Sequence, residues 1–206
     1  MSVFLTIHPL DPQAHLLRKA AAMVNQGGVI VYPTDSGYAL ACQIGNKQAL
    51  DRIRRIRNLD EKHHFTLVCR DLSELSTYAI VTDRIYKILK NYTPGPYTFI
   101  LKATREVPRR LQHPKRKTIG IRIPDHIIAL ALLETLDAPL MSTTLTIPGE
   151  NINFLEAQAI NDILANQVDL IIDGGNCGLE PTTVIDLSGE SPVILREGKG
   201  DIEPFL

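Results

Sequence analysis

Short apolar runs alternate with amphipathic segments along almost the whole chain, and this alternation limits the possible folds most strongly. Several runs are apolar nearly throughout, as strands are when helices cover both faces of a sheet. The pattern predicts an α/β fold: one domain, residues 1–206, with a twisted mixed β-sheet flanked by helices. The expected strands are residues 29–33, 38–42, 65–70, 97–103, 118–124, 139–145, 168–175, 182–187 and 192–198. The expected helices lie within residues 12–28, 46–57, 71–91 (two helices, separated near 81–82), 127–136 and about 155–166.

Composition narrows the class of protein. A chain of 206 residues with 44% hydrophobic and 22% charged residues can bury one sizeable core and has the balance of a soluble globular protein. No apolar run approaches the length of a transmembrane helix, and the first residues lack the pattern of a signal peptide. The three cysteines are odd in number, with no CxxC pair. We therefore expect a reduced, cytoplasmic protein with no membrane partner and no cysteine metal site.

The net charge of −1 hides an uneven distribution of charge along the chain. Residues 1–122 contain 20 Lys and Arg against 9 Asp and Glu, whereas residues 123–206 contain 2 against 14. This asymmetry indicates an anionic partner for the first part, although the two parts could equally neutralise each other across the surface.

The densest basic segment runs from Lys102 to Arg122, where Glu106 is the single acid and the balance is +7. That charge is enough to neutralise several backbone phosphates of a nucleic acid. Because the segment lacks interleaved aromatic residues, it indicates a surface that follows phosphates rather than one that stacks bases. The candidate RNA-binding residues are Arg105, Arg109, Arg110, Lys115, Arg116 and Lys117.

Thr34-Asp35-Ser36-Gly37 separates two expected strands. Open α/β sheets place their ligands just past strand ends, and the hydroxyls here could hold a small polar ligand. The same residue types also favour a tight turn, so the sequence leaves both interpretations open.

The helix at 46–57 carries a second candidate, because Arg54, Arg55 and Arg57 point away from its apolar face. Arginine suits phosphate or carboxylate, but a solvated basic face would look the same. Common motifs for phosphate loops, dinucleotides, serine hydrolases and zinc proteases are absent. His63 and His64 form an adjacent pair without further ligands, so no metal site is predicted.

Eight ordered blocks between Gly27 and Gly198 resemble the YrdC/TsaC family of threonylcarbamoyl-adenylate synthases, and the spacing is most similar to its YciO branch. The blocks are "GGVIVYPTDSGYALAC", "RIRRIRN", "TPGPYTFIL", "TIGIRIPDH", "PLMSTT", "VDLIIDGG", "TTVID" and "ILREG".

The resemblance implies a large concave basic cleft over the sheet and a reaction of ATP, bicarbonate and L-threonine. The products would be threonylcarbamoyl-AMP, used in tRNA modification, and pyrophosphate, with Mg²⁺ accompanying the nucleotide. The family is also described as binding double-stranded RNA. A tRNA- or double-stranded-RNA-binding protein without synthase activity is therefore the alternative. The oligomeric state is not predicted.

The resemblance also assigns residue roles. It implies threonine binding by Thr34, Arg122 and Thr182, and nucleotide binding by Thr118 and Arg196. The catalytic positions are Arg55 and Arg57 of a KxR element and Ser142 and Thr144 of an SxN element. This chain departs from both elements, because Arg55 replaces the lysine and Thr144 the asparagine. About four extra residues follow Arg57, and Arg70 replaces a family histidine.

Overall fold

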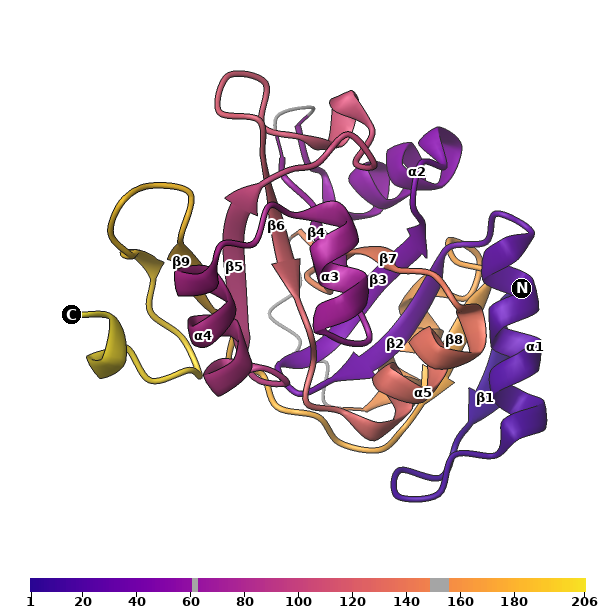
Figure 1. The fold of residues 1–206 in the computed structure, drawn as a ribbon. Helices are drawn as coiled ribbons and strands as arrows, with labels where there is room; N and C mark the ends of the chain where they lie inside the picture. Colours follow the sequence, from indigo (N-terminus) through magenta and orange to yellow (C-terminus); the bar gives the residue numbers. More distant parts are fainter. Residues whose placement is uncertain (61–62, 149–155) are drawn as a thin grey trace.

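One ten-stranded mixed sheet organises the molecule, which is described by a computed structural model for residues 1–60, 63–148 and 156–206 (Figure 1). The strand order is β1-β8-β2-β3-β7-β4-β6-β5-β9-β10. The sheet contains parallel pairs, such as β1–β8 and β4–β6, and antiparallel pairs, such as β2–β3 and β5–β6. The strands are β1 (Val3–Thr6), β2 (Ile30–Thr34), β3 (Gly37–Gln43), β4 (Thr66–Val68), β5 (Tyr97–Lys102), β6 (Thr118–Arg122), β7 (Leu140–Thr144), β8 (Leu170–Asp173), β9 (Thr183–Asp186) and β10 (Val193–Arg196).

Helix boundaries follow local capping. Asn46 accepts a hydrogen bond from the N–H of Ala49 at 3.0 Å, and Asn58 ends the same helix in the left-handed conformation with φ of 50°. Asp71 and Thr82 cap the next two helices, which explains the predicted break near residues 81–82. The helices are α1 (Ala14–Asn25), α2 (Lys47–Arg57), α3 (Leu72–Tyr78), α4 (Asp83–Tyr92), α5 (Ile127–Leu136) and α6 (Ala157–Leu164), with short 3₁₀ turns η1 (Arg109–Leu111) and η2 (Glu203–Phe205).

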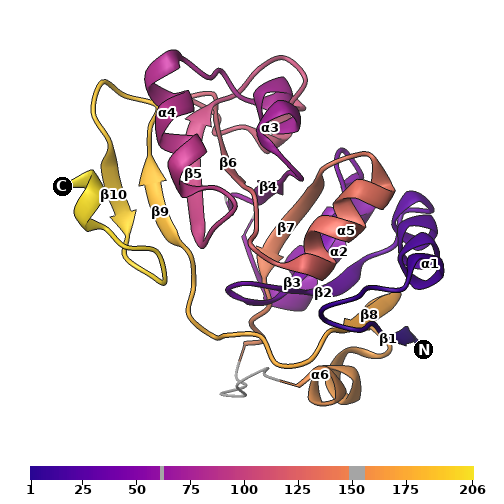
Figure 2. The ribbon, with the colours of Figure 1, turned by 60° about the horizontal axis from the view of Figure 1, so that its bottom comes forward.

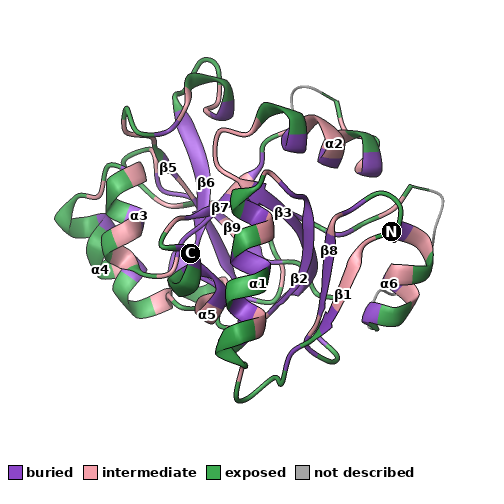
Figure 3. Ribbon diagram, turned by 90° about the vertical axis from the view of Figure 1, so that its right-hand side faces the viewer, coloured by how far each residue is buried: buried purple, intermediate pink, exposed green. Residues whose placement is uncertain are grey.

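The core divides into two apolar clusters because successive strand residues point to opposite faces. On β2, Val31 joins a cluster that includes α2 and α6, whereas Ile30 and Tyr32 join a cluster with α1 and α5. Figure 2 shows α1 and α5 packed side by side, and Figure 3 shows the inward helix residues buried and the outward ones exposed. The predicted α/β fold is confirmed.

Two elements differ from the sequence prediction. The edge strand β1 was not predicted, because its four residues include a single buried one and carry little alternation. It gains its place by pairing in parallel with the buried strand β8. The helix expected at about 155–166 is α6, and Leu155, at its expected start, lies outside the described residues.

Candidate functional site

The segment 34–37 is a tight β-hairpin turn that also faces a cleft. Thr34 pairs with Gly37 across the antiparallel ladder, so Asp35 and Ser36 form the two-residue loop. Gly37 has φ of +114°, and a Cβ there would lie 2.7 Å from the carbonyl oxygen of Gly178. The Thr34 hydroxyl donates to the Gly37 carbonyl at 2.6 Å and accepts from the Ser36 N–H at 3.2 Å. The turn interpretation is therefore confirmed, and because Thr34, Ser36 and Gly37 line the cleft, the ligand interpretation stays a prediction for the same residues.

The cleft has a volume of about 360 Å³ and its floor is the sheet itself. Because side chains alternate between faces, residues two apart on five strands line it together, and a sixth pair begins at Thr182, just before β9. These pairs are Tyr32 and Thr34, Thr66 and Val68, Thr98 and Ile100, Gly120 and Arg122, Ser142 and Thr144, and Thr182 and Val184; Arg57, His63–Phe65 and Arg196 stand around them. Among the described lining residues there is no Asp or Glu, and three are arginines, so the cleft favours anions.

Arg122 lies almost fully buried on the cleft floor. It forms an ion pair with Asp35 of the hairpin turn, and its Nη1 donates to the Ser36 hydroxyl at 2.9 Å. Arg122 Nε and Asp35 Oδ2 are buried and have no hydrogen-bond partner among the described residues. The pair is therefore held in place with donor and acceptor capacity left over, which is uncommon for buried charges.

Arg57 reaches the cleft from the C-terminal turn of α2. Its guanidinium donates to the Thr143 hydroxyl and, through Nη2 at 2.6 Å, to that of Thr146. His63 Nε2 lies 3.3 Å from the same Thr143 oxygen. Burial lowers the pKa of Arg57, and burial followed by the charge of Arg57 lowers that of His63. An anion in the cleft would offset this cost of burial.

Arg196 of β10 supplies the third cation. Its Nε and Nη2 donate to the carbonyl of Thr182 at 3.1 and 2.7 Å, and Nη2 also reaches the Thr182 hydroxyl at 3.1 Å. Thr182 in turn lies 2.9 Å from the hydroxyl of Thr98. Burial lowers the pKa of Arg196. The arrangement fixes one planar guanidinium at the β9–β10 side of the cleft.

Ser142 of β7 is fixed by two partners, Leu40 on the neighbouring strand β3 and Tyr32 on β2 beyond it. Its hydroxyl donates to the Leu40 carbonyl and accepts from the Tyr32 hydroxyl, both at 3.1 Å. Burial raises the pKa of Tyr32, which keeps the phenol protonated as a donor. The sheet thus orients Ser142, and the hydroxyl hydrogen of Ser142 is engaged in the bond to the Leu40 carbonyl.

The structure brings together seven of the nine predicted small-ligand residues. The cleft is lined by Thr34, Arg57, Arg122, Ser142, Thr144, Thr182 and Arg196. Arg55 lies elsewhere, exposed on α2 with its Nε 3.4 Å from the carbonyl of Asp51. Thr118 is buried at the start of β6 and is not among the cleft-lining residues. Arg70, at the position of the family histidine, pairs with Asp137.

Sequence reasoning missed several lining residues, notably Tyr32, Thr98 and Thr143. A polar threonine within an apolar strand was the available signal, since such residues mark a face that is not packed. The six predicted RNA-binding residues are all exposed, and Arg116 is paired with Asp186 at 2.7 Å.

Burial disfavours the reactive thiolate form of all three cysteines. Cys42, Cys69 and Cys177 are buried and unpaired, and burial raises the pKa of Cys42 to about 12 and that of Cys177 to about 11. No group of three or more His, Cys, Asp or Glu side chains in residues 1–60, 63–148 and 156–206 could hold a metal ion. The helices of those residues include none long and apolar enough to cross a membrane.

Similar proteins reveal the family. The Sua5/YciO/YrdC family model, described as "Telomere recombination", matches residues 22–198. YciO of Escherichia coli K12 is 57% identical over the full length of both chains, and its crystal structure matches with a TM-score of 0.95. A putative threonylcarbamoyl-AMP synthase of Methanocaldococcus jannaschii is 30% identical over 84% of this chain and 80% of its own. Pyrococcus abyssi Sua5 complexed with L-threonine matches with a TM-score of 0.89 and 25% identity, over 98% of this chain but 59% of Sua5. The predicted family is confirmed: the chain belongs to the Sua5/YciO/YrdC family.

Proposed function

We propose that this protein binds ATP and L-threonine in the cleft and forms threonylcarbamoyl-AMP from them and bicarbonate, releasing pyrophosphate. The observation that carries the proposal is the convergence of Arg57, Arg122 and Arg196 around one cleft whose described lining has no carboxylate. Likeness to threonylcarbamoyl-AMP synthases and to a Sua5 structure with bound L-threonine supports the same substrates.

The two ends of the cleft suit different parts of this reaction. Arg122, next to the hairpin turn, offers donors for the carboxylate of an amino acid. Arg57 of α2 and Arg196 of β10 line the same cleft and offer donors for the phosphates of the nucleotide. Fixed cations beside a phosphoryl group stabilise the charge that develops as pyrophosphate leaves, and holding both reactants close removes much of the entropic barrier. The chain would thus act mainly by positioning and by electrostatic stabilisation.

The Mg²⁺ expected with the nucleotide has few protein ligands to use. Mg²⁺ prefers carboxylate and phosphate oxygens, and the described cleft-lining residues include no carboxylate. The ion would therefore be held by phosphate oxygens and water, and the arginines would share the neutralisation of the phosphates.

Binding measurements on two variants test this assignment. Arg196→Gln should weaken ATP binding about tenfold or more, and Arg122→Gln should do the same for L-threonine, because each loses charge-assisted hydrogen bonds. Arg18→Gln removes a charge from the exposed face of α1 and is the matched control. Equal affinities for wild-type and Arg196→Gln protein in calorimetric titrations with ATP would contradict the proposal.

RNA binding is a second candidate function, favoured by one observation. Arg105, Arg109, Arg110, Lys115, Arg116 and Lys117 are all exposed within one connection between β5 and β6. Such a surface should bind the backbone of double-stranded RNA with a steep dependence on salt and little sequence preference. Affinity that stays constant between about 50 and 200 mM salt would exclude this mode of binding.

A further inference from the structure

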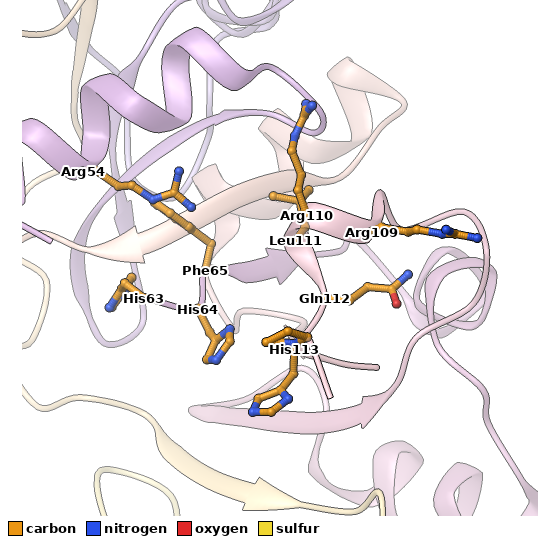
Figure 4. Close-up of a pocket in the computed structure, with 10 residues that line it drawn as sticks. Arg54, His63, His64, Phe65, Arg109, Arg110, Leu111, Gln112 and His113 are labelled. Carbon is orange, nitrogen blue, oxygen red and sulfur yellow. The ribbon is translucent and has the colours of Figure 1, made fainter. Parts of the chain in front are cut away.

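A second hollow lies beside the cleft, which we call the arginine pocket. It has a volume of about 420 Å³ and is lined by Arg54, His63–Phe65 and Arg109–Pro114 (Figure 4). His63–Phe65 also line the cleft, so these three residues form the wall between the two hollows. The arginine pocket therefore adjoins the proposed active site but draws its other residues from α2 and the β5–β6 connection.

The charge of the arginine pocket is positive. Its lining contains Arg54, Arg109 and Arg110 and, within the described residues, no Asp or Glu. Arg109 and Arg110 are exposed and extend away from the centre, where they add to the local potential (Figure 4). Arg110 is fixed by donating to the carbonyl of Gly45. Positive potential focused over a hollow raises the local concentration of anions.

Arg54 is the cation closest to the interior. Its Nη1 donates to Asp51 at 2.9 Å, its guanidinium lies 5.3 Å from the ring centre of Phe65, and its Nε is buried without an acceptor among the described residues. One partly exposed carboxylate compensates this charge incompletely. An anion in the pocket would complete the compensation, and the ring of Phe65 would strengthen the attraction by excluding water.

Two of the three imidazole rings that line the pocket stack against each other. His64 and His113 stack with ring centres 5.1 Å apart. His113 Nδ1 accepts from the N–H groups of Lys115 and Arg116, at 3.3 and 3.0 Å, so its proton is on Nε2. His113 is therefore set up as a hydrogen-bond donor, which suits an oxyanion.

From this geometry we infer that the arginine pocket is a second anion site, which binds a small oligophosphate such as pyrophosphate independently of the nucleotide in the cleft. Phosphate oxygens match the guanidinium of Arg54 and the His113 donor, and a multiply charged anion gains most from the positive potential that Arg109 and Arg110 add. The inference does not depend on the proposed synthase activity.

NMR of the six histidine side chains can test it with pyrophosphate as the probe. The His113 resonance reports the arginine pocket, and that of His126, which senses Asp35 and Arg122, reports the cleft. Pyrophosphate should shift the His113 resonance saturably. The affinity obtained from this titration should fall about tenfold or more in Arg54→Gln and stay within about twofold of wild type in Arg18→Gln. If Arg54→Gln proves unstable, Arg109→Glu, at an exposed position, is the second variant, and it should also lower the affinity for pyrophosphate.

An ATP titration separates this inference from the proposed function. Arg54→Gln should leave the ATP affinity of the cleft within about threefold, and Arg196→Gln should weaken ATP without changing the His113 response. Three results would overturn the inference: no saturable His113 shift, equal pyrophosphate affinity in Arg54→Gln and Arg18→Gln, or a parallel loss of ATP and pyrophosphate binding in Arg54→Gln. Failure of ATP to bind would reject the proposed function alone.

Discussion

Replacing Arg122 by methionine removes one half of the ion pair on the cleft floor and leaves Asp35 behind. The two side chains are 10% and 7% exposed, so neither charge is solvated as it would be in water. Removing one partner of a buried pair costs about 3–5 kcal/mol, because the remaining charge stays desolvated. For a domain stabilised by about 5–15 kcal/mol, this is a large fraction of the free energy of unfolding.

The double variant Arg122→Met with Asp35→Asn distinguishes this cause from lost packing. Once the carboxylate is also neutralised, no unpaired charge remains, so the double variant should be about 2 kcal/mol more stable than Arg122→Met alone. Urea denaturation followed by circular dichroism gives both values, and the slope with urea should stay constant. A double variant whose loss equals the sum of the two single losses would refute the reasoning.

Three further predictions concern other parts of the molecule. Asn46→Ala removes the cap of α2 and should cost about 1 kcal/mol in urea denaturation; no loss would show that the cap is not used. Phe99→Ala, at a fully buried position, should cost about 3–5 kcal/mol in the same assay, whereas Tyr86→Ala on exposed α4 should cost much less. Burial and then the charge of Arg57 lower the pKa of His63, so its imidazole takes up a proton more readily in the unfolded chain than in the folded one. Protonation of His63 therefore does not affect the free energy of unfolding above about pH 6.5 and lowers it as the pH falls below that value. His63→Asn should therefore reduce the fall in stability between pH 6.5 and 5, and an unchanged pH profile would contradict this.

Much of the fold could be predicted because local signals agree with the tertiary structure. Asn46, Asp71 and Thr82 are good caps at true helix starts, and α5 occupies the predicted residues 127–136. Strand β1 escaped prediction because its pairing with β8 joins segments more than 160 residues apart. No local pattern reports such a partner.

The candidate site was predictable in part for a similar reason. Resemblance to family motifs identified residues such as Thr34 and Arg196, and strand alternation explains why they share one face. The resemblance could not show that Arg55 points to solvent. Neighbouring arginines on a helix differ in direction by about 100°, and packing of the helix against the core decides which of them faces the cleft. Nor could it show the Arg122–Asp35 pair, which depends on the hairpin turn meeting β6.

The central claim is that the cleft makes threonylcarbamoyl-AMP, and product analysis tests it most directly. The purified protein would be incubated with ATP and Mg²⁺, with and without L-threonine and bicarbonate, while pyrophosphate is measured and nucleotides are resolved by mass spectrometry. We expect pyrophosphate release that requires both threonine and bicarbonate, accompanied by the carbamoyl-adenylate. Binding of ATP with no such product under these conditions would contradict the claim and would indicate that the cleft acts on another substrate.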